Sequence, residues 1–184
     1  MPFIETGFKG LFVFEPKVFQ DARGYFFESF NKQSFHNAGI DVEFVQDNES
    51  KSQRGVLRGL HYQLNPMAQA KLVRVVEGEV LDVVVDIRTG SPTFGKHFSL
   101  LLTAENKKQL FIPRGFAHGF SVLSHTCIFQ YKCDNYYSKE SEGGISFKDP
   151  SLNIDWGFDI STALVSDKDQ ALPMLKDCVN NFQF

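Results

Sequence analysis

The sequence predicts an all-β fold, a sandwich or barrel of short strands, on three observations. Short apolar segments with strand-like patterning follow one another at close spacing along the chain. Glycine, proline, asparagine and serine separate these segments. Phenylalanine is abundant, with 20 of the 184 residues, and aromatic side chains favour strands and layered packing. We expect one domain over residues 1–184, which is long enough for a substantial core.

The clearest strand pattern covers residues 81–87. Leucine, valine or isoleucine stands at each odd position and aspartate or valine at each even one, which is a period of two. A strand at residues 71–76 precedes it, and Glu77-Gly78-Glu79 provides the turn between the two. Further short strands are expected at residues 98–102, 109–112, 119–123 and 127–133.

Helix signals are few and short, so only a few peripheral helices are expected around the strands. Residues 31–38 favour a helix that ends at Gly39. A second helix begins at Ser166, where Ser166-Asp167-Lys168-Asp169 has the S-x-x-D form of a capping box. Residues 150–157 form an ordered loop that holds Trp156, which we expect to cover the core.

The composition is ordinary for a globular protein, with 42% hydrophobic and 22% charged residues. The net charge of −3 provides no positive field for nucleic acid, so an anionic ligand needs local arginine and lysine clusters. We see no leader-like segment and no apolar run long enough to span a bilayer, and we expect a cytoplasmic protein without membrane contact. Cys127 and Cys133 are about 20 Å apart along one expected strand, which favours reduced, buried thiols over a disulfide between them.

Three stretches combine groups that suit proton transfer. They are Arg58-Gly59-Leu60-His61-Tyr62-Gln63, Pro113 to Gly119 and Phe129 to Lys132, and each lies in or beside a strand-like segment. Together they supply a base, an acid and several cations. This combination suits proton movement on carbons next to a carbonyl in an anionic substrate.

His61 is the candidate base. An isolated histidine is usually a core residue, but Arg58 stands three residues away, and a guanidinium is rarely buried without an anion. Strict alternation would place Arg58 and His61 on opposite faces of a strand. Gly59 lies between them, where a β-bulge would restore a common face, so the sequence predicts a bulge there.

The other catalytic candidates each have a structural alternative. Tyr131 shares strand parity with Phe129 and faces the core, either as a tyrosine bonded to the backbone or as a proton donor across from His61. Asp169 either completes the helix cap or pairs with His61 and stabilises its imidazolium form. Lys71 either keeps its ammonium in water or faces inward and polarises an oxyanion.

Arg23, Phe26 and Glu28 lie in the segment Asp21-Ala22-Arg23-Gly24-Tyr25-Phe26-Phe27-Glu28. A charged turn that leads into an edge strand explains them structurally. The same three side chains also suit a site for a nucleotide base and a phosphate, by stacking and by charge. Periodicity does not distinguish these two interpretations.

Pro113-x-Gly115-x-x-His118 resembles the second motif of the cupins, which are small double-stranded β-helix, or jelly-roll, barrels. In metal-binding cupins the first motif holds a His-x-His pair, whereas this chain has His61-Tyr62-Gln63. The second histidine is missing, and the ligands of an open metal site are hard to assemble from what remains. We therefore expect a cupin-like jelly-roll barrel with no metal.

Matches to one family run in order through nearly the whole chain. They include Val56 to Gln63, Lys71-Leu72-Val73-Arg74 and Ser91-Pro92-Thr93-Phe94-Gly95. Further matches lie at residues 15–19, 21–28, 44–48, 82–88, 112–120, 131–132, 136–137, 142–143, 166–169 and 173. On these residues the chain resembles the dTDP-4-dehydrorhamnose 3,5-epimerases, and the number of ordered matches makes the resemblance specific.

The resemblance implies an enzyme that works without a metal or any other cofactor. It gives His61 the role of proton acceptor, Tyr131 that of proton donor and Asp169 that of the acid paired with the base. It places Lys71 and Arg58 around the sugar and its enolate. It assigns contacts to the nucleotide sugar to Gln46, Asn48, His118, Glu142 and Lys168.

The implied reaction is epimerisation of dTDP-4-dehydro-6-deoxy-D-glucose at C3 and C5, which gives dTDP-4-dehydro-L-rhamnose. The C4 ketone acidifies the hydrogens on C3 and C5, a base removes one to leave an enolate, and an acid returns a proton to the opposite face. The resemblance also implies a homodimer, because Arg23 and Glu28 match residues that reach a neighbouring subunit's site.

Four alternatives stay open at this point. Two lie close to the main one: an epimerase that inverts C3 or C5 alone, and a 3,4-ketoisomerase of a related dTDP-4-keto-6-deoxy sugar. A metal-dependent oxygenase and a sugar-binding module without catalysis are built on the same barrel.

Overall fold

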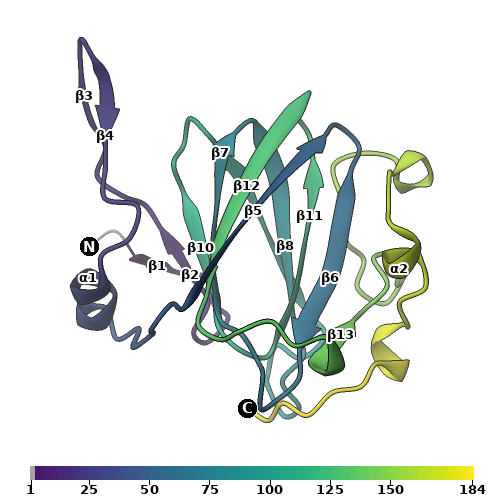
Figure 1. Cartoon of the computed structure of the whole chain (residues 1–184). Helices are drawn as coiled ribbons and strands as arrows, with labels where there is room; N and C mark the ends of the chain where they lie inside the picture. Colours follow the sequence, from purple (N-terminus) through teal and green to yellow (C-terminus); the bar gives the residue numbers. More distant parts are fainter. Residues whose placement is uncertain (1–2) are drawn as a thin grey trace.

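Two antiparallel sheets face each other in a jelly-roll barrel in the computed structural model, which describes residues 3–184 (Figure 1). The first sheet has the order β1 (Phe3–Glu5), β2 (Phe12–Phe14), β10 (Gln109–Ile112), β7 (Lys71–Glu77), β12 (Thr126–Cys133) and β5 (Gln46–Gln53). The second has the order β13 (Glu142–Gly144), β6 (Leu57–Gln63), β11 (Phe116–Val122), β8 (Glu79–Asp86) and β9 (His97–Thr103). The expected all-β jelly roll is confirmed.

The expected strands form, with small shifts at their ends. The segments predicted at residues 71–76, 109–112 and 127–133 become β7, β10 and β12. The turn before β8 is shorter than predicted, because Glu77 and Glu79 join the strands and leave only Gly78 between them. The sequence does not predict β5, whose residues are polar throughout. This strand lies at the sheet edge and pairs with β12 alone. An edge strand can be polar, so the sequence of β5 carries no alternation of apolar residues that would predict it.

The two predicted helices are present and are capped as expected. Helix α1 (Lys32–Asn37) begins after Asn31, whose side chain accepts a hydrogen bond from the backbone N–H of Ser34, and Gly39 follows with φ of 80°. Helix α2 (Asp167–Gln170) begins after Ser166, whose Oγ accepts from the backbone N–H of Asp169 at 3.1 Å. Three short 3-10 helices lie at Lys139–Ser141, Ile160–Thr162 and Leu175–Asp177.

The core between the sheets is apolar and aromatic. Val73 of β7 and Phe129 of β12 meet Val84 of β8 and Phe120 of β11, and the two phenylalanine rings stack with centroids 4.2 Å apart. Asp82 has the same parity as Val84 and therefore faces the barrel, where it is fully buried. The alternation in β8 thus points its aspartates toward the interior of the barrel and its odd-numbered residues toward the outer face of the second sheet.

The chain that follows β13 covers this outer face of the second sheet (Figure 1). Val83 and Val85 of β8 pack there against Phe147 and Trp156. Trp156 is 1% exposed, and its indole Nε1 donates a hydrogen bond to the Phe147 carbonyl at 3.0 Å. The predicted role of Trp156 as a cover of the core is confirmed, and the same layer carries α2 to the side of β6 (Figure 1).

A β-bulge interrupts β6 at the predicted glycine. His61 pairs with His118 of β11 and Arg58 pairs with Phe120, so two residues of β6 stand opposite one residue of β11. Gly59 has φ of 122°, a conformation that favours glycine. The extra residue restores a common face, because Arg58 and His61 line the same cavity.

A two-stranded hairpin projects away from the barrel (Figure 1). It comprises β3 (Phe19–Asp21) and β4 (Gly24–Phe26), and all of these residues are exposed. A 2.6 Å ion pair between Arg23 and Asp21 closes its turn. Lys107 of the body places its ammonium 3.9 Å from the centre of the Tyr25 ring, which holds the hairpin from one side. We call this element the arm.

None of the helices within residues 3–184 has the length and apolar character needed to cross a lipid bilayer. The three cysteines are free thiols, and Cys127 and Cys133 are buried.

We predict that Gly59→Ala destabilises the protein by about 3 kcal/mol or more in urea unfolding, because strain at positive φ and steric overlap add up. A Cβ at this position would lie 2.5 Å from Gly119 Cα and 2.8 Å from the His118 carbonyl oxygen. Gly24→Ala is the matched control, since Gly24 has φ of 127° but a Cβ there would meet no atom within 4 Å. Its cost should be about 1–2 kcal/mol, and equal losses in the two variants would contradict a crowded bulge.

Candidate active site

A cavity with two lobes lies between β6 and β11 of one sheet and β7 and β12 of the other. The lobes have volumes of about 440 and 340 Å³. Both are lined by His61, Lys71, Tyr131 and Lys168, so these four side chains stand at the junction of the lobes. The four are separated widely in the sequence, and the barrel brings together the catalytic candidates that the sequence singled out.

His61 and Asp169 form a close pair. His61 Nε2 lies 2.7 Å from Asp169 Oδ1, and the backbone N–H of Gly59 donates to Asp169 Oδ2 at 3.1 Å. Because a carboxylate only accepts, this contact requires a proton on Nε2, and the tautomer that it selects has its lone pair on Nδ1. Burial raises the pKa of Asp169, but hydrogen bonds from His61, Gly59 and Ser166 and the charge of His61 bring it below its ordinary value. Asp169 therefore stays ionised beside the candidate base.

Asp169 makes a contact that fits each of its two interpretations. The helix cap uses its backbone N–H, which bonds to Ser166, while its carboxylate is free to orient His61. A helix cap and a partner for a base are thus compatible at one residue.

Lys71 faces the cavity from β7. Within residues 3–184 its ammonium makes neither a salt bridge nor a side-chain hydrogen bond, and it lies 5.7 Å from the centre of the Tyr131 ring. Burial lowers the pKa of Lys71 below its ordinary value, and the nearby Cys133 and Asp82 oppose this in part. An inward cation without an acceptor suits an oxygen that gains negative charge during a reaction.

Tyr131 also faces the cavity, on the strand next to Lys71. Burial raises the pKa of Tyr131, Cys133 adds to the rise and Arg58 opposes it. The phenol is therefore protonated at neutral pH and is able to donate a proton. The predicted inward parity of Tyr131 with Phe129 is confirmed.

His118 forms a second histidine–aspartate contact in the cavity wall. His118 Nε2 lies 2.8 Å from Asp82 Oδ2, and its ring stacks on Phe129 with centroids 6.1 Å apart. Among residues 3–184, Asp82 Oδ1 is a buried oxygen without a hydrogen-bond partner. His118 thus lines the cavity, while the predicted contact to a nucleotide sugar stays a prediction.

The smaller lobe is lined by polar side chains that hold one another in place. Lys168 and Glu142 form a 2.7 Å ion pair. Burial raises the pKa of Glu142, but Lys168, Tyr137 and His61 bring it below its ordinary value. The predicted residues Gln46 and Asn48 also lie here and are joined by a 3.0 Å hydrogen bond.

Arg58 lies at the larger lobe with only a neutral partner. Its Nε and Nη2 donate to Ser52 Oγ at 3.2 and 3.1 Å. Arg58 is exposed, and no carboxylate within residues 3–184 neutralises it. Together with Lys168 it supplies positive charge for an anionic group of a ligand.

The arm residues are the exception among the predicted site residues. Arg23, Phe26 and Glu28 lie outside the cavity of their own chain: Arg23 pairs with Asp21, and Glu28 accepts a hydrogen bond from Asn31. One chain alone therefore does not bring them to His61. Gln63, which replaces the second histidine of the metal-binding cupin motif, donates to the carbonyls of Met67 and Tyr136 and tethers two loops.

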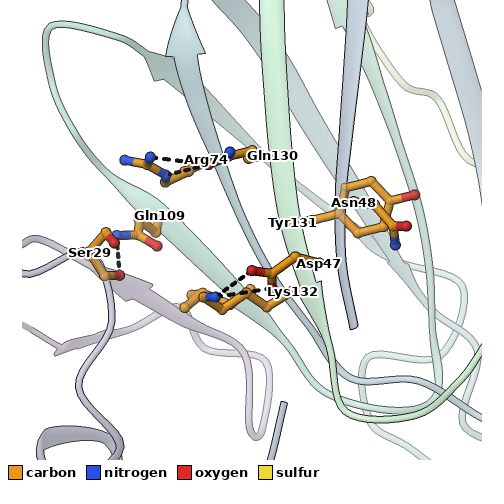
Figure 2. A pocket seen from close by; sticks show the side chains of 9 residues that line it. Ser29, Asp47, Asn48, Arg74, Gln109, Gln130, Tyr131 and Lys132 are labelled. Atoms are coloured by element: carbon orange, nitrogen blue, oxygen red, sulfur yellow. Dashed lines mark hydrogen bonds and ion pairs between the residues drawn. The ribbon is translucent and has the colours of Figure 1, made fainter. Parts of the chain in front are cut away.

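A further hollow lies on the outward face of the first sheet (Figure 2). Its polar groups satisfy one another through Arg74 with Gln130 at 3.1 Å, Lys132 with Asp47 at 3.0 Å, and Gln109 with the Ser29 carbonyl at 2.7 Å. Tyr131 extends to the other side of β12, away from Lys132 (Figure 2). The cations that line this hollow are therefore already paired, unlike Lys71 in the inner cavity.

Several cavity residues were not singled out from the sequence. They are Ser50, Gln69, Tyr137 and the apolar Val56, Leu57, Phe120 and Leu164. Asp82, which is buried behind the cavity wall and contacts His118, was not singled out either. Asp82 does have a signal in the sequence, because a carboxylate inside the largely apolar strand β8 needs a partner when it is buried. Val56, Gln69, Tyr137 and Leu164 lie outside the strands, where periodicity gives no information, and Leu57 begins β6. Ser50 and Phe120 lie within β5 and β11, but periodicity does not tell which inward residues border a cavity.

A comparison with protein families decides the identity of the chain. The family model for dTDP-4-dehydrorhamnose 3,5-epimerase matches residues 5–177. The chain belongs to this epimerase family. The epimerase from Shigella flexneri is 59% identical over 170 residues, which cover 92% of this chain and 93% of the relative.

Solved structures of family members share the fold. The epimerase from Elizabethkingia anophelis has a TM-score of 0.92 and 53% identity, and the match covers 95% of this chain and 96% of the other. The epimerase from Legionella pneumophila, solved in complex with dTDP-4-keto-L-rhamnose, has a TM-score of 0.91 and 50% identity, with 95% and 93% covered. The expected resemblance is confirmed, and with it the assignment to the isomerases.

We predict that Lys71 becomes reactive toward amine-directed acylating reagents at lower pH than the ordinary lysine value of 10.5, because burial lowers its pKa. Competitive labelling read by mass spectrometry gives the midpoint for each lysine. Asp82→Asn should move the Lys71 midpoint further down, since the charge of Asp82 raises it. Asp47→Asn on the outward face is the control and should leave it unchanged, and a Lys71 midpoint at or above 10.5 would show that its ammonium is well solvated.

Proposed function

We propose that the protein catalyses the epimerisation of dTDP-4-dehydro-6-deoxy-D-glucose at C3 and C5, which gives dTDP-4-dehydro-L-rhamnose. The observation that carries this proposal is the junction of the two lobes, where the His61–Asp169 pair, the Tyr131 phenol and the Lys71 ammonium line one cavity. These groups supply a base, an acid and a cation. The complex of the Legionella pneumophila relative with dTDP-4-keto-L-rhamnose supports the substrate class.

The proposed chemistry uses protein side chains alone and needs no cofactor. His61 Nδ1 takes a proton from C3 or C5, and the electron pair of the broken C–H bond forms a carbon–carbon double bond while C4 oxygen becomes an enolate. Lys71 holds that charge. Asp169 stabilises the imidazolium that forms. When the enolate collapses, the carbon takes a proton from Tyr131 on the opposite face, which inverts the centre and leaves the ketone restored.

Binding of the nucleotide sugar is assigned to the polar groups of both lobes. Arg58 and Lys168 are placed to hold the diphosphate, and Gln46 and Asn48 to bind polar groups of the sugar or nucleoside. His118 and Glu142 complete the walls. Binding energy from these remote contacts would fix the sugar between base and acid.

We further propose a homodimer in which the arm of one subunit completes the site of the other. The arm exposes 53% of Phe19 and 67% of Phe26, and such apolar exposure on a projecting element favours burial by a partner. Arg23, which is exposed beside them, would add a charge for the nucleotide. We place the protein in the cytoplasm, as its free thiols, of which Cys127 and Cys133 are buried, suit a reducing compartment.

Incubation with dTDP-4-dehydro-6-deoxyglucose in deuterated water tests the reaction. Wild-type protein should incorporate deuterium at C3 and C5 and give the inverted product by NMR. His61→Ala should lose exchange at both carbons by a factor of about 10²–10⁴, the scale of general base catalysis. Tyr131→Phe should keep exchange but fail to invert C5, because the base still reaches its proton while the donor on the opposite face is gone.

Circular dichroism of both variants checks that the barrel is intact. Near-normal turnover of folded His61→Ala would remove His61 from the role of base. Inversion of a single centre by the wild type would mean a single-site epimerase, a product with its ketone at C3 a ketoisomerase, and a complete lack of exchange a binding module.

Subunit complementation tests the arm. A chain with Arg23→Glu and Phe26→Asp has an intact cavity and a damaged arm, while His61→Ala has the reverse. Coexpressed in equal amounts, the two should recover about a quarter of wild-type activity, because half of the dimers are mixed and each mixed dimer has one complete site. Coexpression of His61→Ala with Tyr131→Phe is the control and should recover nothing, since both defects lie in the cavity. An arm variant with full activity by itself would refute the shared site.

A further inference from the structure

Ser52 belongs to the inward row of β5, but its hydroxyl contacts another side chain of the site. The side chains of β5 alternate, so that its even-numbered residues are shielded and its odd-numbered residues are exposed. Gln46 and Asn48 line the smaller lobe, and Ser50 lines the larger one. Ser52, which continues this row, is buried and accepts hydrogen bonds from Arg58.

The contact between Ser52 and Arg58 joins the two sheets beside the larger lobe. Arg58 Nε and Nη2 donate to Ser52 Oγ at 3.2 and 3.1 Å, and the two residues lie on β6 of the second sheet and β5 of the first. One oxygen that accepts from two nitrogens of the same group restricts the rotation of the guanidinium plane. Nη1 takes no part in this contact, so it is left for a ligand in the lobe that Arg58 lines.

The partner of Arg58 is a neutral hydroxyl, which orients a charge without cancelling it. Elsewhere in the chain Arg23, Arg88 and Arg114 contact aspartates at 2.6, 2.7 and 3.0 Å. A carboxylate in place of Ser52 would hold the guanidinium group at least as firmly, but it would compete with an anionic ligand for it. A serine hydroxyl therefore fits a site in which the arginine has to be both ordered and charged.

The order of Arg58 before ligand binding contributes to affinity. Arg58 is exposed, and an exposed arginine that is mobile loses side-chain freedom when a ligand immobilises it. The contact with Ser52 removes part of that freedom in the free protein. Loss of the contact should therefore weaken binding by about 3–10-fold, which is the scale of immobilising one long side chain.

We propose that Ser52 is a positioning residue that aligns Arg58 for the diphosphate of the nucleotide sugar. The proposal rests on the proposed epimerase function and adds to it a residue that acts on the ligand through another side chain. The diphosphate keeps its charge while protons move at the sugar ring. Ser52 should therefore support the binding of substrate and transition state equally, so its loss raises KM and not the barrier to the chemical step.

Substitutions of Ser52 test the alignment. Titration calorimetry with dTDP measures binding of the nucleotide diphosphate, and product NMR gives kcat and KM. Ser52→Ala should weaken dTDP binding and raise KM by about 3–10-fold, with kcat within about twofold of the wild type. Ser52→Thr keeps the hydroxyl and should restore the affinity for dTDP. Ser52→Asp keeps the contact but cancels the charge, so it should bind dTDP more weakly than Ser52→Ala does.

Ser146→Ala is the matched control. Ser146 is 4% exposed and Ser52 8% exposed, and the Ser146 hydroxyl accepts a hydrogen bond from the backbone N–H of Lys148 in the layer that follows β13. Its removal should leave the affinity for dTDP and the KM unchanged. Urea unfolding of all variants checks that the barrel is intact.

A double-mutant cycle separates alignment of Arg58 from a structural role of Ser52. If Ser52 acts through Arg58, the loss of dTDP affinity caused by Ser52→Ala should vanish in an Arg58→Ala background. An equal loss in both backgrounds, a lower kcat with unchanged KM, or wild-type affinity of Ser52→Ala would overturn the proposal. Wild-type protein that binds dTDP without deuterium exchange into the sugar would refute the epimerase function alone, whereas wild-type protein that does not bind dTDP would refute both.

Discussion

One carboxylate holds the two halves of the site together. Asp169 accepts the backbone N–H of Gly59 through one oxygen and contacts His61 through the other, across more than a hundred residues of sequence. The first contact stabilises the bulge that turns Arg58 and His61 to a common face, and the second orients the base. The geometry of β6 and the protonation state of His61 therefore both depend on Asp169. A change in one of them affects the other through this carboxylate.

The distribution of charge explains why a chain with a net charge of −3 suits an anionic substrate. On the outward face of the first sheet, arginine and lysine are matched by amides and carboxylates, as between Lys132 and Asp47. Inside, Lys71 and Arg58 have no carboxylate partner within the described residues. Lys71 and Arg58 thus bring to the cavity positive charge that no direct ion pair cancels, which suits an anionic ligand. His118, which lines the same cavity, has a carboxylate partner in the buried Asp82.

Local pattern was sufficient for much of the fold and for the main catalytic candidates. The inward side of Tyr131 follows from strand parity, and the bulge at Gly59 from the requirement that two polar neighbours share one face. Local pattern was insufficient where distant segments decide burial. Alternation normally leaves aspartates in water, but the layer after β13 covers the outer side of β8 and leaves Asp82 facing the barrel. Likewise β5 is a strand because β12 pairs with it, and its polar residues carry no signal of that pairing.

The layer that follows β13 also determines at which stage of synthesis and folding the site is complete. It carries Trp156 as a cover for the second sheet and Asp169 as the partner of the base, and both belong to the last strandless stretch of the chain. During synthesis the ribosome releases His61 more than a hundred residues before Asp169. All the barrel strands precede α2, since β13 ends at Gly144. His61 therefore gains its hydrogen-bond partner only when the segment that carries Asp169 has folded back along β6.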